Sequence, residues 1–295
     1  MSMYAICRRE SELNENGKKP LEESEECSRN KRLKICDETV PWDVEFAIEE
    51  PGIVHRVRAH RRVVTRSSPV FETIFRDSPA SKLFQVSDVT YDAFEVMVNA
   101  MYGSDYGIGS IATACRTLLA AKKYVMPSVA VYCIDYVTRR FDATNACEIV
   151  EFSLRHDLDD LLRVSCVGIG PHACEILVHP SFLSCSLETL LVILSLDSLI
   201  VPSEAVVSDA CVCWAEAHCS KYGLEPTKDH MRSALGPALG KIRFLSMTAL
   251  QLIESSAFDR LLTDEEARTI LINIIKPASC PLPRSICVGC IRRGH

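Results

Sequence analysis

The end of the chain contains the side chains best suited to bind a metal ion. Cys287 and Cys290 form a C-x-x-C knuckle, and Cys280 and His295 lie close to it along the chain. Thiolates and imidazoles are the ligands that zinc takes in four-coordinate structural sites. Only one close cysteine pair is present, and His295 is the last residue, where chain ends fray. We therefore expect no metal site, and a zinc knuckle is the alternative.

Catalytic residues are not expected either. His60 precedes a predicted helix, where an imidazole could act as a general base, but no partnered nucleophile is evident nearby. We therefore predict that the His60 ring bonds a neighbouring backbone group. Asp43 and Arg61 are interpreted in the same way, as residues that stabilise the fold. The sequence predicts no catalytic residue and no cofactor.

Two further candidates also have structural interpretations. The glycines of the Gly168-x-Gly170 stretch lack a preceding strand and a third glycine, so they do not predict a phosphate-binding loop. Trp214 lies on an apolar helical face together with Cys211, which predicts a core position.

Composition indicates a globular protein with two domains or one large one. The chain has 295 residues, of which 47% are hydrophobic and 24% charged, so it can bury a sizeable core. Its net charge is -6, whereas a nucleic-acid-binding protein usually carries a basic face. The balance therefore favours protein partners and no nucleic acid.

Targeting signals are weak in this sequence. Arg8, Arg9 and Glu10 stand where a secretory signal would need an apolar stretch. The longest apolar run, residues 187–201, is interrupted by polar side chains, so no membrane span is predicted. We expect a cytoplasmic location, with the nucleus as a second one. The 15 cysteines should then be reduced, and most should be small buried hydrophobic residues.

Periodicity predicts a small strand-rich start. Apolar residues alternate with polar ones from Trp42 to Ile48 and again over residues 53–59, and Pro51-Gly52 between them favours a hairpin turn. Residues 83–86 are a third candidate strand. Apolar residues then recur at helical spacing in three segments, 94–102, 108–119 and 129–141.

Beyond Asp142 the pattern predicts only helices. Asn145 is placed as the cap of a helix that ends at Arg155, and residues 158–166 form the next one. Pro171 is placed in the first turn of a third helix. Further helices are expected over residues 187–196, 204–219 and 231–239, and residues 250–275 close the domain. The short loops between them favour antiparallel helical neighbours.

These patterns divide the chain into four parts. Residues 1–41 are polar and mixed in charge, so we expect them to be disordered. Their short basic run is interpreted as a solvated tail, with a nuclear signal as the alternative. Residues 42–141 form an α+β domain, residues 142–276 form a helical domain, and residues 277–295 form a flexible tail that contains cysteines.

The stretch from Arg58 to Phe75 resembles the BTB (POZ) domain. The family pattern is a strand, then A-H-R, a helix and S-P-V-F-x-x-x-F, and this chain has Ala59-His60-Arg61 followed by Ser68-Pro69-Val70-Phe71 and Phe75. Other parts of the domain are matched by Asp43-Val44-Glu45-Phe46, Asp88-Val89-Thr90, Phe94, Tyr102, Ala120-Ala121-Lys122-Lys123-Tyr124 and Cys133. The resemblance covers Trp42 to Phe141 and implies a small sheet flanked by helices.

The second part of the chain resembles a BACK domain, which is entirely helical. The matching residues are Asn145-Ala146-Cys147, Phe182-Leu183, Asp197, Leu199, Glu204, Trp214-Ala215, Ile242-Arg243-Phe244 and Met247-Thr248. The chain as a whole is therefore expected to be α+β and mostly helical. It is similar to BTB–BACK proteins that also carry a PHR β-sandwich, but it stops before such a domain could fit. Kelch repeats, with a period of roughly 50 residues, are not seen.

The resemblance implies a non-catalytic protein-interaction module. BTB domains form homodimers through apolar contacts among their first helices, with ordinary core packing as the alternative for each residue. The candidates here are Val63, Val64, Phe71 and Ile74. Many BTB–BACK proteins are substrate adaptors of cullin-3 ubiquitin ligases. By position, the cullin contact would involve Phe75, Phe94, Tyr124 and Asn145 with the helices up to Cys166. The substrate protein is not identified.

One segment departs from the cullin-binding pattern. Members that bind cullin often place an apolar-x-Glu element shortly after the S-P-V-F helix. Residues 76–81 read Arg-Asp-Ser-Pro-Ala-Ser, with no Glu, and Pro79 restricts the local backbone. A dimeric scaffold that acts independently of ubiquitin, with a transcriptional or cytoskeletal partner, is therefore the second hypothesis.

Overall fold

The computed structural model describes residues 40–103, 106–283 and 285–287. The disordered segment predicted for residues 1–41 lies outside this range except for its last two residues. Residues 277–283 and 285–287 of the predicted tail lie within it. Two compact units are present. The first comprises the residues up to Val86 together with Glu95–Gly107, and the second comprises Ser87–Phe94 and the chain from Ile108 onward. Each unit is described by itself below.

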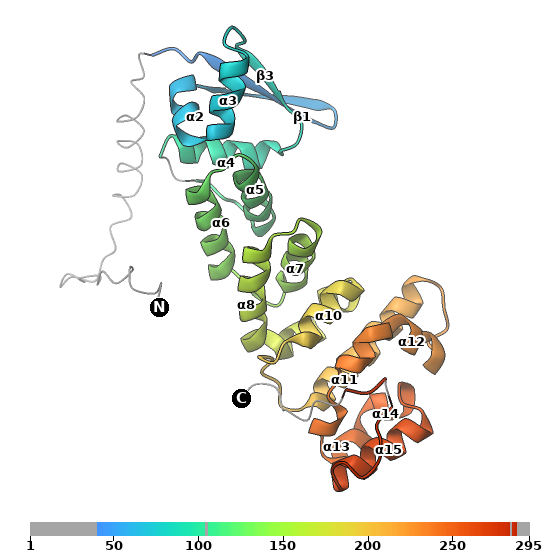
Figure 1. Cartoon of the computed structure of the whole chain (residues 1–295). Helices are drawn as coiled ribbons and strands as arrows, with labels where there is room; N and C mark the ends of the chain where they lie inside the picture. Colours follow the sequence, from blue (N-terminus) through green and yellow to red (C-terminus); the bar gives the residue numbers. More distant parts are fainter. Residues whose placement is uncertain (1–39, 104–105, 284, 288–295) are drawn as a thin grey trace, which may run out of the picture. The chain divides into compact units, whose positions relative to one another are not determined.

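A three-stranded sheet forms the centre of the first unit (Figure 1). Strands β1 (Val44–Glu50) and β2 (Ile53–Ala59) make the predicted antiparallel hairpin, with Gly52 at a φ of 83° in the turn. Only glycine adopts such a backbone conformation without strain. Strand β3 (Leu83–Val86) pairs in parallel with β1, which gives the order β2-β1-β3.

Helices α2 (Arg61–Ser67) and α3 (Pro69–Asp77) supply one side of the core of this unit. The Ser68 side chain accepts a hydrogen bond from the Phe71 backbone N–H, and Pro69 occupies the first helical position. The helix that begins here buries Phe71 and Phe75 in the core. There Phe46 of β1 lies edge-on to Phe71, with 5.4 Å between ring centroids.

The helical series that follows agrees with the predicted class. Helix α4 (Tyr91–Met101) covers most of the predicted segment 94–102, and Ser110 caps α5 through its side chain. The described residues beyond Val86 contain no further strand. The helices from α5 on are α5 (Ile111–Lys123), α6 (Pro127–Arg139), α7 (Ala146–Arg155), α8 (Asp159–Val178), α9 (Pro180–Ser184), α10 (Leu187–Ser195), α11 (Glu204–Lys221), α12 (Lys228–Leu235), α13 (Ala249–Glu254), α14 (Ser256–Arg260) and α15 (Asp264–Ile275). Short 3-10 turns at Gly236–Lys241 and Phe244–Ser246 stand between α12 and α13.

The prediction that Pro171 opens a new helix is wrong, because α8 runs without interruption from Asp159 to Val178. An interior proline removes one backbone hydrogen bond and crowds the carbonyl four residues earlier, which belongs here to Val167. Val167 is 73% exposed, so water can reach this turn of the helix. Gly170 tolerates no side chain, since an added Cβ would lie 2.6 Å from the Ser198 carbonyl oxygen.

Helix α8 is also the one helix in the described residues that is long and apolar enough to cross a membrane, judged by length and composition alone. The longest apolar run predicted from the sequence, residues 187–201, is a different segment from this helix. The helix packs against α7, and its residues Ile169, Ala173 and Ile176 are fully buried in the apolar core of the second unit. This is how a core helix of a helical domain packs.

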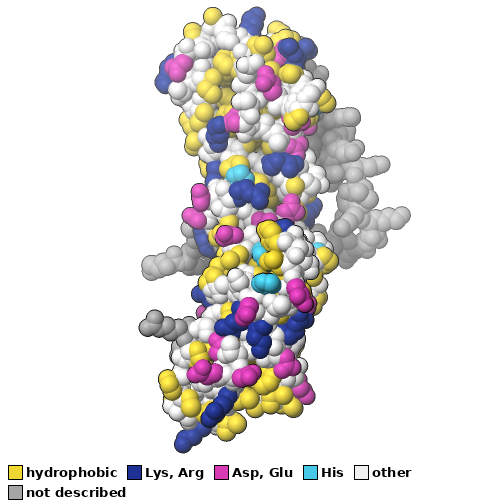
Figure 2. Space-filling model, turned by 90° about the vertical axis from the view of Figure 1, so that its right-hand side faces the viewer, with side chains coloured by type: hydrophobic (Ala, Val, Ile, Leu, Met, Phe, Trp, Pro, Cys, Tyr) yellow, Lys and Arg dark blue, Asp and Glu magenta, His cyan; other side chains and the backbone are white. Residues whose placement is uncertain are grey.

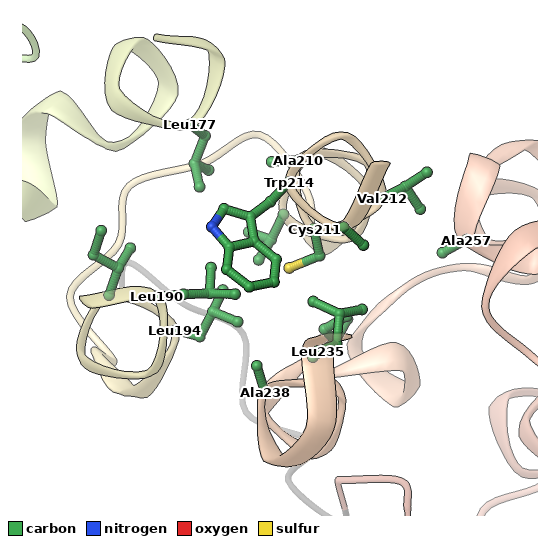
Figure 3. Close-up of a cluster of buried hydrophobic side chains, with 14 of the residues drawn as sticks. Leu177, Leu190, Leu194, Ala210, Cys211, Val212, Trp214, Leu235, Ala238 and Ala257 are labelled. Carbon is green, nitrogen blue, oxygen red and sulfur yellow. The ribbon is translucent and has the colours of Figure 1, made fainter. Parts of the chain in front are cut away.

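Trp214 lies at the centre of the core of the second unit, as predicted (Figure 3). It belongs to α11, which packs against α9, α12 and α14. The ring is 1% exposed and faces Leu190 and Leu194 of α10 and Leu177 of α8. Its Nε1–H donates a hydrogen bond to the Cys185 carbonyl oxygen at 3.1 Å, so the polar atom of the indole is satisfied.

Candidate partner-binding surface

His60 has the structural role that the sequence predicts. Its Nε2 lies 3.0 Å from the Val40 carbonyl oxygen, and its Nδ1 lies 2.8 Å from the Tyr102 hydroxyl. The His60 backbone N–H donates to the same hydroxyl at 2.8 Å. Both ring nitrogens are therefore held by the fold, and the imidazole ties the start of α2 to the end of α4.

Asp43 and Arg61 also stabilise the fold, as predicted. A carboxylate oxygen of Asp43 accepts the Arg61 backbone N–H at 2.7 Å, at the first residue of α2. The Arg61 guanidinium lies 4.7 Å from the centroid of the Phe75 ring and also bonds the Ser81 carbonyl oxygen. Arg61 thus joins α2, α3 and the segment before β3.

The zinc knuckle falls partly outside the described residues, because Cys290 and His295 lie there. Cys280 is half-buried, and its backbone N–H donates to Asn273 Oδ1 at 3.4 Å. Among the residues that the structure describes, no group of three His, Cys, Asp or Glu side chains is placed to hold a metal ion.

The four candidate dimer residues lie on α2 and α3. Val64 and Phe71 are at most 1% exposed and belong to the core of the first unit, and Val63 is 9% exposed. Ile74 is half-buried and presents part of its side chain to solvent. A dimer role for these four residues stays a prediction.

The candidate cullin-contact residues are mostly buried as well. Phe75 is 6% exposed, Phe94 is 0% and Tyr124 is 5%, and burial raises the pKa of the Tyr124 hydroxyl. Phe75 lies inside α3, which ends at Asp77, so Arg76 and Asp77 stand exposed at its last turn. Partner binding by these residues stays a prediction.

Asn145 is the candidate whose predicted local role needs correction. It precedes α7, but its side chain makes no capping bond there, because its backbone is near-helical rather than extended. Its Nδ2 donates instead to the Arg140 carbonyl oxygen at 2.8 Å, and its Oδ1 accepts the Asp142 N–H at 3.1 Å. Asn145 therefore fixes the turn between α6 and α7.

A small pocket lies between α5 and α7. Its volume is about 60 Å³. Ligand pockets for metabolites are roughly 300–1,000 Å³, so this one has room for little more than a single aliphatic side chain. The lining residues are Ile111, Ala112, Cys115, Arg116, Glu148, Ile149 and Phe152.

Arg116 is the polar group of this pocket. Its Nη2 donates to Asp92 Oδ2 at 2.5 Å, which holds the guanidinium in one orientation. Its Nε is buried and has no hydrogen-bond partner. Among the described residues, Thr117 Oγ1 is the other buried side-chain N or O atom without one. An unpaired buried N–H costs roughly 1–3 kcal/mol.

Asp92 orders the residues around Arg116. Burial alone would raise the pKa of the Asp92 carboxyl, but hydrogen bonds from Arg116, Thr90 and Thr113 lower it well below its ordinary value. The Thr113 hydroxyl donates to Asp92 Oδ2 at 2.8 Å. The carboxylate therefore stays ionised at neutral pH and keeps Arg116 in place.

The thiol in the pocket is not suited to nucleophilic chemistry. Burial, together with the negative charge of Glu148, raises the pKa of Cys115 to about 12. The thiolate is the nucleophilic form, so this thiol is inert at neutral pH. The pocket is lined by apolar side chains, the Arg116 side chain and the exposed carboxylate of Glu148.

Charged side chains of both signs are interspersed on the face drawn in Figure 2, with hydrophobic side chains between them. This distribution agrees with the modest net charge of -6. Mixed charges at the rim of an apolar contact favour specificity in protein recognition.

Comparison with known protein families identifies both domains. Residues 34–140 match the BTB/POZ domain, and residues 146–255 match the BACK domain, described as "BTB And C-terminal Kelch". The chain is therefore a BTB–BACK protein, and these domains are protein-interaction modules. No PHR domain is found in the sequence. The predicted boundaries at residues 42–141 and 142–276 stay predictions.

Several curated relatives are named as BTB/POZ domain-containing proteins. BTB/POZ domain-containing protein 6-B of Danio rerio is 31% identical over 247 residues, which are 83% of this chain and 51% of the relative. BTB/POZ domain-containing protein 6 of Homo sapiens is 31% identical over 83% of this chain and 45% of its own. BTB/POZ domain-containing protein 3 of Homo sapiens is 29% identical over 83% and 47%. The chain spans about half the length of the relatives it matches.

The pocket draws its walls from both matched domains, and sequence reasoning missed most of it. Ile111 and Cys115 stand out in the sequence as apolar helix positions, whereas Arg116, Glu148 and Phe152 do not. The one sequence signal for the pocket is Arg116, a charged residue in a largely apolar helix. Its orientation depends on its ion pair with Asp92, which lies 24 residues away in the chain.

Proposed function

We propose that this BTB–BACK chain acts as a homodimeric substrate adaptor that binds the N-terminal domain of cullin-3 through the surface formed by α5 and α7. The observation that supports this most is the pocket that α5 of the BTB match and α7 of the BACK match line together. The proposal assigns no reaction to the chain itself, since ubiquitin transfer would be carried out by the ligase machinery.

The pocket suits one apolar side chain followed by a hydrogen-bond acceptor. Ile111, Ile149 and Phe152 offer apolar walls. Removing an aliphatic side chain from water contributes roughly 1.5–3 kcal/mol, which is the scale of a single interface anchor. A backbone carbonyl or carboxylate of the partner beside that anchor would accept a hydrogen bond from the exposed part of the Arg116 guanidinium, whose side chain is 39% exposed.

The dimer part of the proposal rests on the exposed side of α3. Ile74 is half-buried there, beside the exposed residues Glu72, Thr73 and Arg76. Size-exclusion chromatography with light scattering would measure the mass of the purified chain. Twice the chain mass is the expected result, and Ile74→Glu should shift the mass toward one chain. A wild-type monomer at micromolar concentration would contradict the dimer.

The cullin part is tested by binding to the purified cullin-3 N-terminal domain. Calorimetry should give a dissociation constant in the micromolar range or tighter for the wild type. Ile111→Glu places a charge against the apolar wall and should weaken binding at least tenfold. Val131→Glu on α6 is the matched control, because Val131 is 67% exposed and outside the pocket. Absence of wild-type binding would refute the cullin proposal. Equal binding by Ile111→Glu and Val131→Glu would refute the proposal that the pocket is the contact site.

A dimeric scaffold independent of ubiquitin is the second candidate function. The segment from Arg76 to Ser81, which lacks the apolar-x-Glu element, favours it. In that case the wild-type chain would remain dimeric by light scattering and would not bind the cullin domain. The substrate or scaffold partner and a cytoplasmic or nuclear location belong to the proposal in either form.

A further inference from the structure

An apolar groove lies between α14 and α15 in the second unit. Its volume is about 460 Å³. Phe258 of α14 lines it together with four side chains of α15, which are Ala267, Leu271, Ile272 and Ile275. Ile275 is 75% exposed, so the groove is open to water. This feature is called the α14–α15 groove below.

Unpaired charges stand at the rim of this groove. Asp259 and Asp264 are exposed, and within the described residues their carboxylates make no hydrogen bond or ion pair. Arg268 is likewise exposed and unpaired there, whereas the Lys228 ammonium donates to the Leu262 carbonyl oxygen at 2.5 Å. Two free carboxylates beside apolar walls suit a segment that presents an apolar side chain next to basic ones. The Arg268 guanidinium can donate to a backbone carbonyl of the same segment.

The sequence that follows the described residues contains an apolar side chain next to basic ones. Residues 288–295 read Val-Gly-Cys-Ile-Arg-Arg-Gly-His, so Ile291 precedes Arg292 and Arg293. This tail carries two arginines and no carboxylate side chain. Its apolar and basic side chains therefore complement the apolar lining and the free carboxylates of the groove.

The chain is held beside α15 just before this tail begins. The Ser285 hydroxyl donates to Glu266 Oε1 in the first turn of α15 at 2.5 Å, and Ile286 is 3% exposed in the core. At 3.6 residues per turn, Glu266 lies on the opposite side of α15 from the groove, so the tail has to pass round the helix. The six residues from Ser285 to Ile291 span up to about 20 Å. Half the circumference of a helix with its side chains is about 16–19 Å, so Ile291 can reach the groove.

We propose that residues 288–295 dock in the α14–α15 groove of their own chain. Ile291 packs against the apolar lining, and Arg292 and Arg293 pair with the two free carboxylates. The apolar contact supplies most of the binding, because exposed ion pairs contribute little. While the tail occupies it, the groove is closed to other proteins. The contact uses none of the residues that line the pocket between α5 and α7, so its failure leaves the proposed function untouched.

Limited trypsin digestion of the full reduced chain tests the docking, because trypsin cuts after Arg292 and Arg293. Intact-mass spectrometry follows the loss of the residues beyond each cut. A synthetic peptide of residues 286–295 gives the rate for an undocked tail. Cleavage of the chain at these two bonds should be about tenfold slower than in the peptide, which is the factor that burial of one aliphatic side chain supplies. Equal rates would overturn the proposal.

Variants of the groove show whether it is the docking site. Leu271→Glu places a charge in the apolar lining and should bring the cleavage rate close to that of the peptide. Asp259→Asn combined with Asp264→Asn keeps the shape of both exposed side chains and should raise the rate about two- to fivefold. Glu265→Gln, at an exposed position of α15 outside the groove, is the matched control and should leave the rate unchanged. Slow cleavage that persists in Leu271→Glu, or an unchanged rate in the double asparagine variant, would contradict the proposal.

Dilution separates the chain's own tail from the tail of a second copy. Protection of the two bonds by the chain's own tail is independent of protein concentration, and this is the expected result. Protection that fades on dilution would mean that the groove binds the tail of another chain, and the proposal would then be wrong.

Discussion

Glu266 is the buried charge whose removal should be felt most clearly. It lies in the first turn of α15, is 5% exposed, and pairs through both carboxylate oxygens with Arg232 of α12, at 2.7 and 3.0 Å. Its side chain also accepts the Thr263 backbone N–H at 2.9 Å and the Ser285 hydroxyl at 2.5 Å. Glu266→Gln keeps the size of the side chain and removes the charge.

The magnitude follows from the acidity of the group. Burial alone would raise the pKa of Glu266, but the hydrogen bonds from Arg232, Ser285 and Thr263 lower it from 4.5 to about 2. Each tenfold change in proton affinity is worth about 1.4 kcal/mol, so the ionised form stabilises the fold by about 3 kcal/mol at pH 7. Because the folded pKa is depressed, this contribution is complete above pH 4.5 and is lost as the pH falls toward 2.

Urea denaturation followed by tryptophan fluorescence measures the effect. The chain has two tryptophans, so Trp42→Phe leaves Trp214 as the reporter in the same unit as Glu266. In this background Glu266→Gln should lower the free energy of unfolding by about 3 kcal/mol at pH 7 and by less than half of that at pH 3. Glu265→Gln, at the exposed neighbouring position, should change it by at most about 0.5 kcal/mol. A loss at Glu266 that does not shrink between pH 7 and pH 3 would refute the electrostatic reasoning.

Two further substitutions test packing in the second unit. Trp214→Ala should cost about 3–5 kcal/mol in urea denaturation, because it empties a fully buried site and leaves the Cys185 carbonyl without its donor; a loss below about 1 kcal/mol would contradict its place at the core. Gly170→Ala should lower the melting temperature by several degrees, since its Cβ would lie 2.6 Å from the Ser198 carbonyl oxygen. Gly109→Ala, which meets nothing within 4 Å, is the control, and an equal shift in both variants would exclude a steric cause.

Much of the fold could be predicted because local signals and burial agree. The alternation from Val44 to Ile48 and the Pro51-Gly52 turn are short-range features, and the hairpin follows from them directly. The parallel pairing of Phe46 with Phe84 could not be predicted in the same way. It joins residues 38 positions apart, and the chain between them forms β2, α2 and α3.

The errors occurred where tertiary contacts override a local preference. Pro171 is a helix-starting signal on propensity alone, yet α8 continues through it because the residues on both sides are held in the core by Ile169 and Ala173. Asn145 has the residue type of a helix cap. The turn after α6 uses its amide to bond the Arg140 carbonyl oxygen, so the side chain is not available to α7.

The candidate binding residues were harder to predict than the fold, and the reason is physical. A hydrophobic side chain in a helix gives the same sequence pattern whether it faces a core, a second copy or a partner. Val64 and Phe71 match the family's dimer region and are buried within the single chain, while Ile111 and Phe152 belong to similar apolar faces and border a pocket. What distinguishes the pocket is the Arg116 side chain, a charged group among its apolar lining residues. Its place beside the pocket is known only once Asp92 and α7 are placed around it, so the pocket is the better basis than the apolar pattern for choosing interface mutations.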